Sequence, residues 1–266
     1  MNVQSYVHEK TLVFTVTTNG YKFLTWNLWL HVMSLSVPWK LCIVCLDKES
    51  HRFFQQIAGI PSVLLPGISL GGQGSQVRIS QHGSNDFNRI TRHKLSAFSE
   101  IIKNQQVETV LYLDSDIVVF QDPLPSLRKY VTPEHPLWFQ CDEHNTSFTC
   151  SGSEQEGQCR NCCTGVIGLE LSSPENRAKL LDLFTFEEGL WKQCRENNDQ
   201  EYIQKRMSMR EVPFRTLPRD TFPNGLFLRE DAWKQLASPV LLHFNFLVGD
   251  AKPRVIKSKG FWLVPY

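Results

Sequence analysis

The sequence predicts an α/β fold: a single domain with a mostly parallel central sheet flanked by helices. The unbroken apolar run at 110–113 and the largely apolar runs at 12–16 and 41–46 are typical of strands buried on both faces, as in parallel sheets. Between the first two runs, apolar residues recur at helical spacing over 24–35, and Pro38 ends that pattern. Strand, helix and strand in this order predict a right-handed βαβ unit.

Length and composition narrow the class of protein. The 266 residues suffice for one α/β core, and no repeat or linker divides them, so we expect a single domain over 1–266. The net charge of +1 argues against nucleic acid or an anionic membrane as partner. No apolar run has membrane-spanning length, and no signal-peptide pattern is visible. These features predict a soluble, cytoplasmic protein, or one of the Golgi lumen if an anchor has been removed.

The later elements follow from the same patterns. A helix is predicted over 91–105, because apolar residues form one stripe along it and Thr91 can cap its start. Pro174 is expected to open a further helix, and the acidic stretch 197–201 another. Apolar runs predict the remaining strands at 137–140, 166–171 and 240–245.

Polar residues follow the first two predicted strands. Thr17 and Asn19 come after the first strand, and Asp47 comes after the second. In open sheets of this type, ligands bind at the carboxyl ends of the strands, so these residues are placed to meet a ligand. Ordinary turn and capping roles are equally compatible with each of them.

Two aspartates end the predicted strand at 110–113. Asp114 and Asp116 project to the same side of an extended segment, and both can face one ion. Carboxylates at the end of a buried strand are costly unless they are neutralised, and a divalent cation with oxygen ligands would neutralise them. The alternative is a strand that ends in a solvated turn.

Two cations lie near the start of the helix predicted at 91–105. Arg92 and Lys94 would oppose the helix dipole there, so an anion bound at the helix start would account for them. The helix leads directly into the strand that carries the two aspartates. A solvated basic face is the alternative interpretation.

Two stretches have no apolar periodicity. The glycine-rich segment 71–75 fits neither glycine fingerprint of a phosphate-binding loop, and we interpret it as a mobile surface loop. The polar, cysteine-rich segment at about 141–163 predicts an insertion or lid.

The eight cysteines leave several interpretations open. Cys42 and Cys45 lie in an apolar run and are expected to be core thiols. Cys159 and Cys162 have zinc-like spacing, but no second pair follows at a matching distance, so disulfides and free thiols remain alternatives. The glycosylation sequon at Asn145 is a further, weak indication of an oxidising lumen.

Taken together, the motifs from Thr11 to Trp262 resemble a family. The chain is similar to nucleotide-sugar-dependent glycosyltransferases with the GT-A fold. It resembles most the retaining nucleotide-diphospho-sugar transferases, which include α-galactosyl- and xylosyltransferases, and more distantly glycogenin-like enzymes. Cys163 departs from the family, which usually has asparagine before Thr-Gly. The motifs that carry the resemblance are 15–21, Lys94-Leu95, 111–116, Asp122-Pro123, 163–165, 198–200, 222–225, His243-x-Asn245 and Gly249-x-x-Lys252-Pro253.

The resemblance implies a reaction and a site. A sugar would pass from a nucleotide-sugar donor, expected to be a UDP-sugar, to a glycan or glycoprotein acceptor, with retention of configuration. A Mn²⁺ or Mg²⁺ ion would be held by Asp114, Asp116 and His243 and would neutralise the leaving diphosphate. Asp199, Gln200 and Lys252 would be catalytic. The donor would be bound by Thr17, Asn19, Arg92, Lys94, Asp114, Ser115, Thr164, Gly165, Asn245 and Gly249.

Two other functions are compatible with parts of the sequence. A phosphatase of the haloacid-dehalogenase type also places Asp-x-Asp after an apolar strand, but its later acidic motif would need an acid where Arg254 stands. A glycan- or partner-binding module could keep the fold without catalysis. The sequence does not indicate the sugar, the acceptor, the linkage or the oligomeric state.

Overall fold

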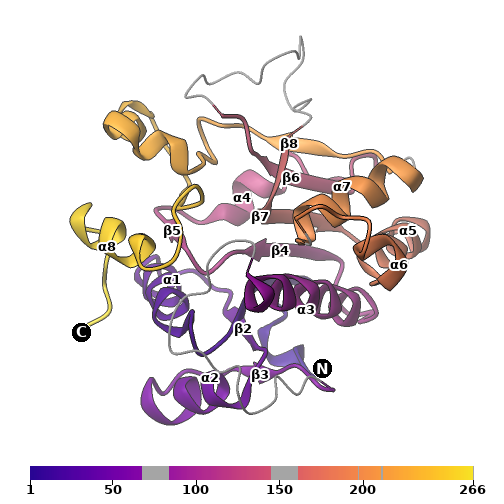
Figure 1. The fold of residues 1–266 in the computed structure, drawn as a ribbon, viewed down its shortest axis with the longest axis horizontal. Helices are drawn as coiled ribbons and strands as arrows, with labels where there is room; N and C mark the ends of the chain where they lie inside the picture. Colours follow the sequence, from indigo (N-terminus) through magenta and orange to yellow (C-terminus); the bar gives the residue numbers. More distant parts are fainter. Residues whose placement is uncertain (68–83, 145–160, 197, 211, 266) are drawn as a thin grey trace.

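The structure is a computed structural model and describes residues 1–67, 84–144, 161–196, 198–210 and 212–265. Within these residues, the central sheet has seven strands, in the order β3-β2-β1-β4-β7-β6-β8 (Figure 1). β7 runs antiparallel to both of its neighbours, and the other pairings are parallel. This confirms the predicted α/β fold with a mostly parallel sheet. The strands are β1 (Thr11–Thr17), β2 (Leu41–Cys45), β3 (Val63–Leu64), β4 (Thr109–Leu113), β6 (Leu137–Cys141), β7 (Cys162–Glu170) and β8 (Arg215–Leu217).

Helices cover both faces of the sheet. Alternate strand residues point to opposite faces, and each face has its own apolar cluster. Leu12 and Phe14 of β1 pack with residues of α3, α5 and α7, whereas Val13 packs with residues of α1, η2 and α4. The helical segments are η1 (Gln4–Tyr6), α1 (Lys22–Ser34), α2 (Lys48–Arg52), η2 (Phe53–Ile57), α3 (Asn85–Ile102), α4 (Pro123–Leu127), α5 (Pro174–Phe184), α6 (Glu188–Trp191), α7 (Asp199–Arg210), η3 (Gly225–Gln235) and α8 (Ala251–Ser258).

A separate two-stranded ladder lies beside the central sheet. β5 (Ile117–Val119) follows the aspartates of the β4 end and pairs antiparallel with β9 (Leu241–His243). Ile117 is directly opposite His243 in this ladder. The ladder, η3 and α8 share a third apolar cluster. Residues near the end of the chain are therefore fixed beside the end of β4.

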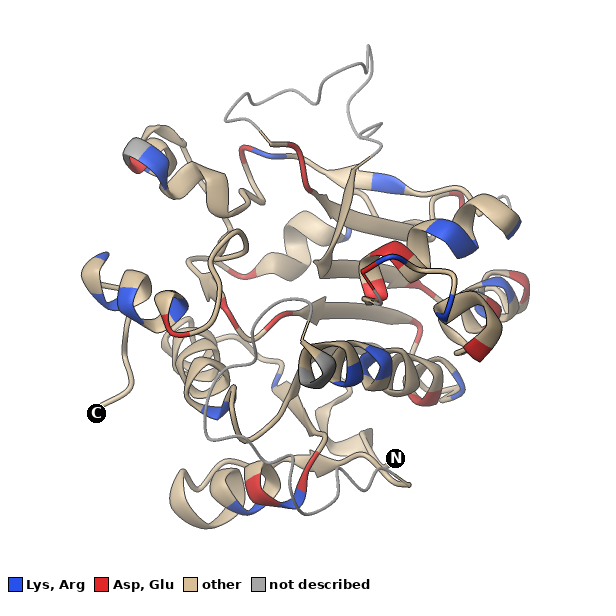
Figure 2. Cartoon of the chain, in the orientation of Figure 1, with Lys and Arg blue, Asp and Glu red and all other residues tan. Residues whose placement is uncertain are grey.

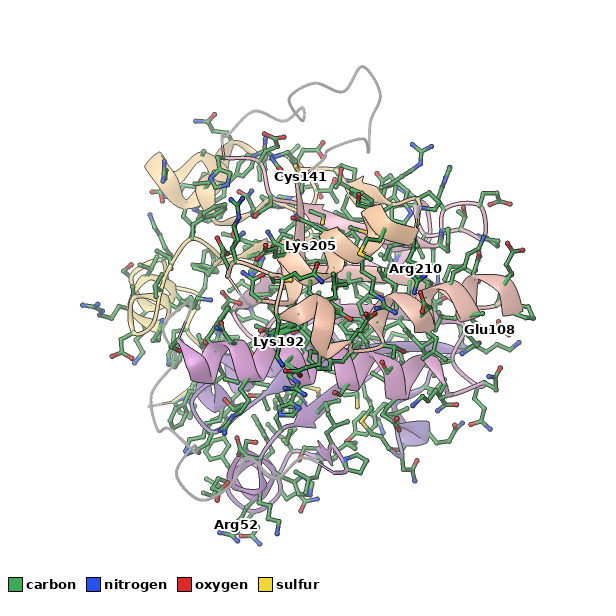
Figure 3. All side chains as sticks on the ribbon, turned by 45° about the vertical axis from the view of Figure 1, so that its right-hand side comes forward. Arg52, Glu108, Cys141, Lys192, Lys205 and Arg210 are labelled. Atoms are coloured by element: carbon green, nitrogen blue, oxygen red, sulfur yellow. The ribbon has the colours of Figure 1, made fainter. Side chains whose placement is uncertain are left out.

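Charged side chains of both signs are interspersed over the fold (Figure 2). Figure 3 views the molecule from the side of the outer helices, where Lys192, Lys205 and Arg210 are labelled. The side chains of Lys192 and Arg210 are more than half exposed. None of the described helices is both long enough and apolar enough to cross a membrane.

The start of α3 differs from the sequence prediction. The helix begins at Asn85 rather than near Thr91, and Ser84 is its N-cap, with its Oγ accepting from the backbone N–H of Phe87 at 3.2 Å. Thr91 is a buried residue inside the helix. Arg92 and Lys94 therefore do not lie in the first turn as predicted, and the argument from the helix dipole for an anion beside them does not apply. The capping signal of Ser84 lies outside the apolar stripe on which the prediction relied.

Two other predictions are confirmed, and the start of one strand differs from its prediction. Pro174 is the first residue of α5, as predicted. β7 begins at Cys162, four residues earlier than predicted, so Cys162 and Cys163 are strand residues rather than part of a lid. Cys42 and Cys45 are fully buried free thiols, which confirms them as core residues. The predictions for 71–75, Asn145 and Cys159 fall outside the described residues.

Candidate active site

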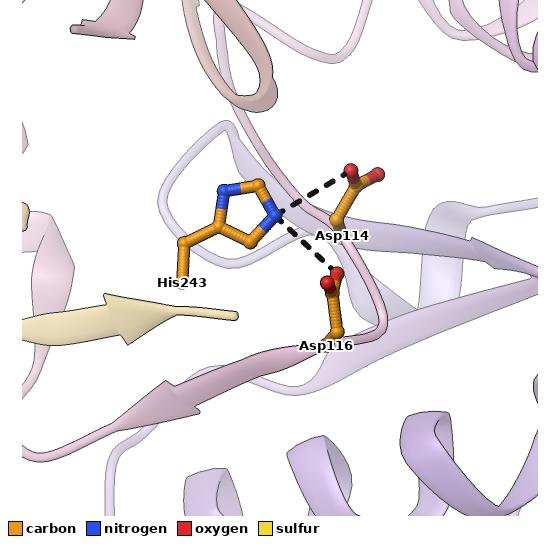
Figure 4. Close-up of side chains that lie close together, drawn as sticks. All are labelled: Asp114, Asp116 and His243. Carbon is orange, nitrogen blue, oxygen red and sulfur yellow. Dashed lines mark ion pairs between the residues drawn. The ribbon is translucent and has the colours of Figure 1, made fainter. Parts of the chain in front are cut away.

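Two aspartates and a histidine converge beyond the end of β4 (Figure 4). The Nε2 atom of His243 lies 3.3 Å from Oδ1 of Asp116 and 3.8 Å from Oδ2 of Asp114. One potential ligand atom from each of the three residues lies within 4.8 Å of the others. Among the described residues, this is the one group of acids, histidines and cysteines with the geometry to hold a metal ion. The structure thus brings together the three residues that the sequence assigns to a metal.

Backbone hydrogen bonds fix the three residues relative to one another. The N–H of Phe244 donates to the carbonyl of Asp116 at 2.9 Å, which extends the β5–β9 ladder by one residue. The N–H of Asp114 donates to the carbonyl of Gly165 in β7 at 2.8 Å. The side chains consequently project from strand ends that belong to packed elements, which is the placement that preorganises a site.

Gly165 provides the space in which the His243 ring lies. A Cβ atom at position 165 would lie 2.0 Å from Cε1 of His243 and 2.7 Å from its Nδ1. No side chain tolerates such contacts, so any residue other than glycine would displace the imidazole. The resemblance assigns Gly165 to donor binding. In the structure, the backbone of Gly165 packs against the ring of His243.

Replacing Gly165 by alanine is expected to destabilise the protein by about 1–3 kcal/mol, the usual cost of overpacking a buried site. The ring of His243 must move, so divalent-cation binding should weaken as well. Urea denaturation and a Mn²⁺ titration measure the two effects. The matched control is Gly189→Ala, because a Cβ atom at Gly189 would meet no atom within 4 Å. Unchanged stability and Mn²⁺ binding in Gly165→Ala would contradict this account.

Two lysines, Lys94 buried and Lys252 partly buried, neutralise part of the acidic charge. Nζ of Lys252 lies 2.7 Å from Oδ2 of Asp116. Burial alone would raise the pKa of Asp116, but the charge of Lys252, together with the contact to His243, outweighs burial and holds this pKa well below its usual range. Conversely, burial would lower the pKa of Lys252, but Asp116 outweighs it and keeps the pKa of the lysine above its usual value.

Lys94 links three segments of the site. Its Nζ lies 2.9 Å from Asp199 and 3.3 Å from Asp114, and it donates to the carbonyl of Thr164 at 2.7 Å. Burial lowers the pKa of Lys94, but Asp114 and Asp199 outweigh that effect, so the net shift is upward and the lysine stays charged. Asp199 does not cap the start of α7. Asn198 does, because its Oδ1 accepts from the N–H of Glu201 at 2.8 Å.

A carboxylate that the sequence analysis missed, Asp142, also lines the cavity. Asp142 accepts from Nε2 of Gln200 and from Nδ2 of Asn245, each at 3.0 Å. Burial raises the pKa of Asp142, although the two amides act in the opposite direction. Gln200 also accepts from the N–H of Thr164 at 3.3 Å. The predicted residues Gln200, Asn245 and Thr164 therefore form one hydrogen-bonded group around Asp142.

The hydroxyls assigned to donor binding have partners inside the protein. The hydroxyl of Thr25 lies 2.7 Å from that of Thr17 and 2.8 Å from that of Ser115. The backbone N–H of Asn19 donates to Asp47 at 2.8 Å, and Asp47 is also the N-cap of α2. These contacts explain why the residues occur at strand ends without requiring a ligand.

A cavity of about 490 Å³ joins these groups at the carboxyl ends of β1 and β4. Most of the predicted site residues line it, but Arg92 and Asn19 do not. Gly249 lines it with φ of +55°, a value that favours glycine. The lining includes the predicted residues Thr17, Lys94, Asp114, Ser115, Asp116, Thr164, Gly165, Asp199, Gln200, His243, Asn245, Gly249 and Lys252.

Arg92 points away from the cavity. Its guanidinium lies 4.0 Å from the ring centre of Phe186 and pairs with Glu188 at 3.4 Å, and its side chain is 44 % exposed. The sequence could not distinguish the two cations near position 91, because that distinction depends on which side of α3 faces the sheet.

Replacing Arg92 by alanine is expected to change the free energy of unfolding by less than about 1 kcal/mol, because exposed ion pairs contribute little. Donor affinity should stay the same, whereas Lys94→Ala should weaken it strongly. Isothermal titration of UDP with Mn²⁺ into both variants compares them directly. A marked loss of UDP affinity in Arg92→Ala would contradict the position that the structure gives this residue.

Comparison with known proteins identifies the class. The family model for nucleotide-diphospho-sugar transferases matches residues 39–255. A search of curated protein sequences finds no match. Among solved structures, the glycosyltransferase GlyE of Streptococcus pneumoniae TIGR4 in its apo form has a TM-score of 0.55 at 14 % identity, over 97 % of this chain and 61 % of that chain. The chain therefore spans less than two thirds of GlyE.

Two further structures agree in fold. Mouse xyloside xylosyltransferase 1 has a TM-score of 0.54 at 11 % identity, covering 88 % of this chain and 97 % of that chain. The bifunctional glycosyltransferase WbbM has a TM-score of 0.55 at 13 % identity, covering 95 % of this chain and 50 % of that chain. At these identities the likeness establishes the fold.

The α/β sheet with a cavity at its carboxyl edge thus has the GT-A fold of glycosyltransferases. The family match covers most of the sequence: this chain belongs to the nucleotide-diphospho-sugar transferases.

Proposed function

We propose that the protein is a metal-dependent, retaining glycosyltransferase that moves a sugar from a UDP-sugar to a glycan or glycoprotein acceptor. The main support for metal dependence is the charge of the side chains that line the cavity. Its described lining contains two lysines and no arginine, but it contains five acids, namely Asp114, Asp116, Asp142, Glu196 and Asp199. A nucleotide diphosphate is itself anionic. It would be repelled by such a cavity unless a cation bound with it.

The chemistry of Asp114, Asp116 and His243 fits a divalent cation. Two carboxylates and an imidazole suit Mn²⁺, while Mg²⁺ prefers oxygen ligands alone. The three potential ligand atoms already lie within 4.8 Å of one another. When bound, the ion would act as a Lewis acid on the diphosphate leaving group.

The lysines extend this neutralisation. Lys252 pairs with Asp116 at the proposed metal site. We propose that its ammonium group pairs with a diphosphate oxygen instead when the donor binds. A fixed cation near developing negative charge lowers the barrier more in a buried site than in water. Lys94 is buried between Asp114 and Asp199, and we propose that it positions both carboxylates for the donor.

Asp199, Gln200 and Asp142 provide hydrogen-bond acceptors and a donor for sugar hydroxyls. Asp142 is held by two amides and Asp199 by Lys94, which makes both carboxylates weak nucleophiles. We therefore favour attack by the acceptor on the same face that the diphosphate leaves. The acceptor hydroxyl would lose its proton to the departing phosphate oxygen.

Incubating the purified protein with individual UDP-sugars and Mn²⁺ is expected to release UDP slowly in the absence of an acceptor. EDTA should stop the release, and excess Mn²⁺ should restore it. Binding of every UDP-sugar without UDP release would instead favour a catalytically inactive binding module. Phosphate release from p-nitrophenyl phosphate would favour the phosphatase interpretation, against which the family match argues.

A further inference from the structure

Gln140 is a polar side chain buried completely beneath the site. It lies in β6 and has no solvent exposure. Its Nε2 atom donates to the backbone carbonyls of Phe222 and Pro223, at 3.1 and 2.9 Å. Carbonyl oxygens only accept hydrogen bonds, so these two contacts require the amide nitrogen on that side. The amide oxygen of Gln140 must then face the opposite way.

On that side lies His243. Oε1 of Gln140 is 2.7 Å from Nδ1 of His243. An amide oxygen has no proton to give, so the hydrogen in this contact belongs to Nδ1. A neutral imidazole carries one ring proton, and with the proton on Nδ1 its Nε2 atom has a free lone pair. Nε2 is the atom that faces Asp116 and Asp114, at 3.3 and 3.8 Å.

A second possible partner of Nδ1 is weaker. Sγ of Cys163 lies 3.8 Å from Nδ1, more than one ångström farther than the Gln140 oxygen. Burial, together with Asp142, raises the pKa of the Cys163 thiol well above its usual value, so the sulfur carries no charge that would attract the ring proton. Gln140 is consequently the dominant partner of Nδ1.

Local strand geometry directs the glutamine at the histidine. The pairing of β6 with β7 shifts register between Phe139 and Gln140. Such irregularities re-aim a side chain relative to a regular ladder. Gly165 leaves the space for the ring on the other side, as described above. The imidazole is thus held by the hydrogen bond between Nδ1 and Gln140 and by the close packing of the ring against Gly165.

We propose that Gln140 is a positioning residue for the metal site: it fixes His243 in the tautomer that presents Nε2 to a divalent cation. The inference rests on the proposed function, because it assigns a role toward the cation proposed there. It predicts that a residue remote from the donor sets metal affinity. Outer hydrogen-bond partners of metal-binding histidines commonly change affinity by about 10–100-fold when removed.

The test combines three variants with two readouts. Gln140→Met keeps the length of the side chain and removes the amide. Gln140→Glu keeps an acceptor oxygen and loses the donor. Asn27→Met is the matched control, because Asn27 is also a buried amide, 1 % exposed, and bonds to the backbone of Phe261 and Leu263 outside the cavity. Mn²⁺ affinity is measured by electron paramagnetic resonance with UDP present. Ring ¹⁵N shifts of metal-free protein at pH 8.5 report the tautomer, with His243→Asn assigning the signal.

We expect wild type and Asn27→Met to show His243 protonated at Nδ1 and to bind Mn²⁺ equally well. Gln140→Met should lose this single tautomer and bind Mn²⁺ about 10–100-fold more weakly. Gln140→Glu should retain the Nδ1–H signal and recover much of the affinity. If Gln140 were merely structural, both Gln140 variants would lower the unfolding midpoint without moving the tautomer.

Two results would contradict the role of Gln140 and leave the proposed function intact. They are a wild-type His243 protonated at Nε2, or a folded Gln140→Met protein with wild-type Mn²⁺ affinity. If Gln140→Met does not fold, the ¹⁵N shifts of wild type and Gln140→Glu still decide the tautomer. A wild-type protein that shows the Nδ1–H tautomer but binds no Mn²⁺ would refute the metal site itself, and with it the proposed function and this inference.

Discussion

Replacing Asp116 by asparagine is expected to abolish metal-dependent turnover of the donor. The substitution keeps the shape of the side chain but removes the charge shared by a proposed cation, His243 and Lys252. Loss of that charge should remove several kcal/mol of transition-state stabilisation. Each ~1.4 kcal/mol is a tenfold change in rate, so release of UDP should fall by about a thousandfold. Initial rates over a Mn²⁺ series measure the effect.

The stability of this variant should fall as well, by about 3 kcal/mol, because the ammonium group of Lys252, whose side chain is only 17 % exposed, would lose its partner. Asp114→Asn is the matched control. The side chain of Asp114 is 31 % exposed, and Lys94 keeps Asp199 as a partner, so this variant should lose less than about 1 kcal/mol. Near-normal Mn²⁺-dependent turnover in both variants would contradict the metal assignment.

Acid titration provides an independent check on Asp116. Its pKa is lowered in the folded protein, so its ion pair contributes stability at any pH above the ordinary carboxyl range, near 4. That contribution decreases as the pH falls below this range toward the folded-state pKa. Asp116→Asn should therefore show a shallower loss of stability than wild type on acidification below about pH 4. Parallel acid-unfolding curves would contradict the predicted role of the ion pair.

Replacing Lys252 by methionine should separate metal binding from transfer. In the structure Lys252 occupies Oδ2 of Asp116, where a cation would compete with it. Without the lysine, Mn²⁺ should bind at least as tightly as in wild type, yet transfer should slow by about 10²-fold because a cation at the diphosphate is missing. The metal-free variant should be less stable, and Mn²⁺ should restore much of that loss because it binds only the folded state.

Calorimetry with and without Mn²⁺, together with UDP release, tests these expectations on one preparation. Lys257→Met, on the same helix, is the control, because Lys257 lies over Trp262 and does not line the cavity. A Lys252→Met protein with weakened Mn²⁺ binding and a normal rate at saturating metal would show that Lys252 supports metal binding rather than sugar transfer.

The sequence alone would have misjudged the stability of these variants. Two neighbouring aspartates suggest mutual repulsion, so removing either one would be expected to leave the unfolding midpoint unchanged or raise it. In the structure Lys252 and Lys94 lie at 2.7 and 3.3 Å from Asp116 and Asp114, and attraction dominates. Pairing across such sequence separations comes from the fold, and no local pattern reveals it.

What could be predicted was encoded in local patterns. The apolar run ending at Asp114 gave the position of β4, and the motif order placed His243 and Lys252 at the same site. The start of α3 was missed because Ser84 caps a turn that precedes the apolar stripe. Gln140 and Asp142 were missed because a lone polar residue inside or after an apolar strand has many ordinary explanations. A glutamine within the otherwise apolar run predicted as a strand at 137–140 was the one available signal.

The pairing of β5 with β9 also has a consequence for folding. The partners Asp116 and Lys252 are 136 residues apart in sequence, so the site closes a very long loop. Closing a loop of that size costs about 4 kcal/mol of chain entropy, and contacts of such high sequence separation slow folding. Until the C-terminal segment docks, the aspartates have no lysine from α8. Lys252 is therefore the internal counterion of Asp116 at the point where this long loop closes.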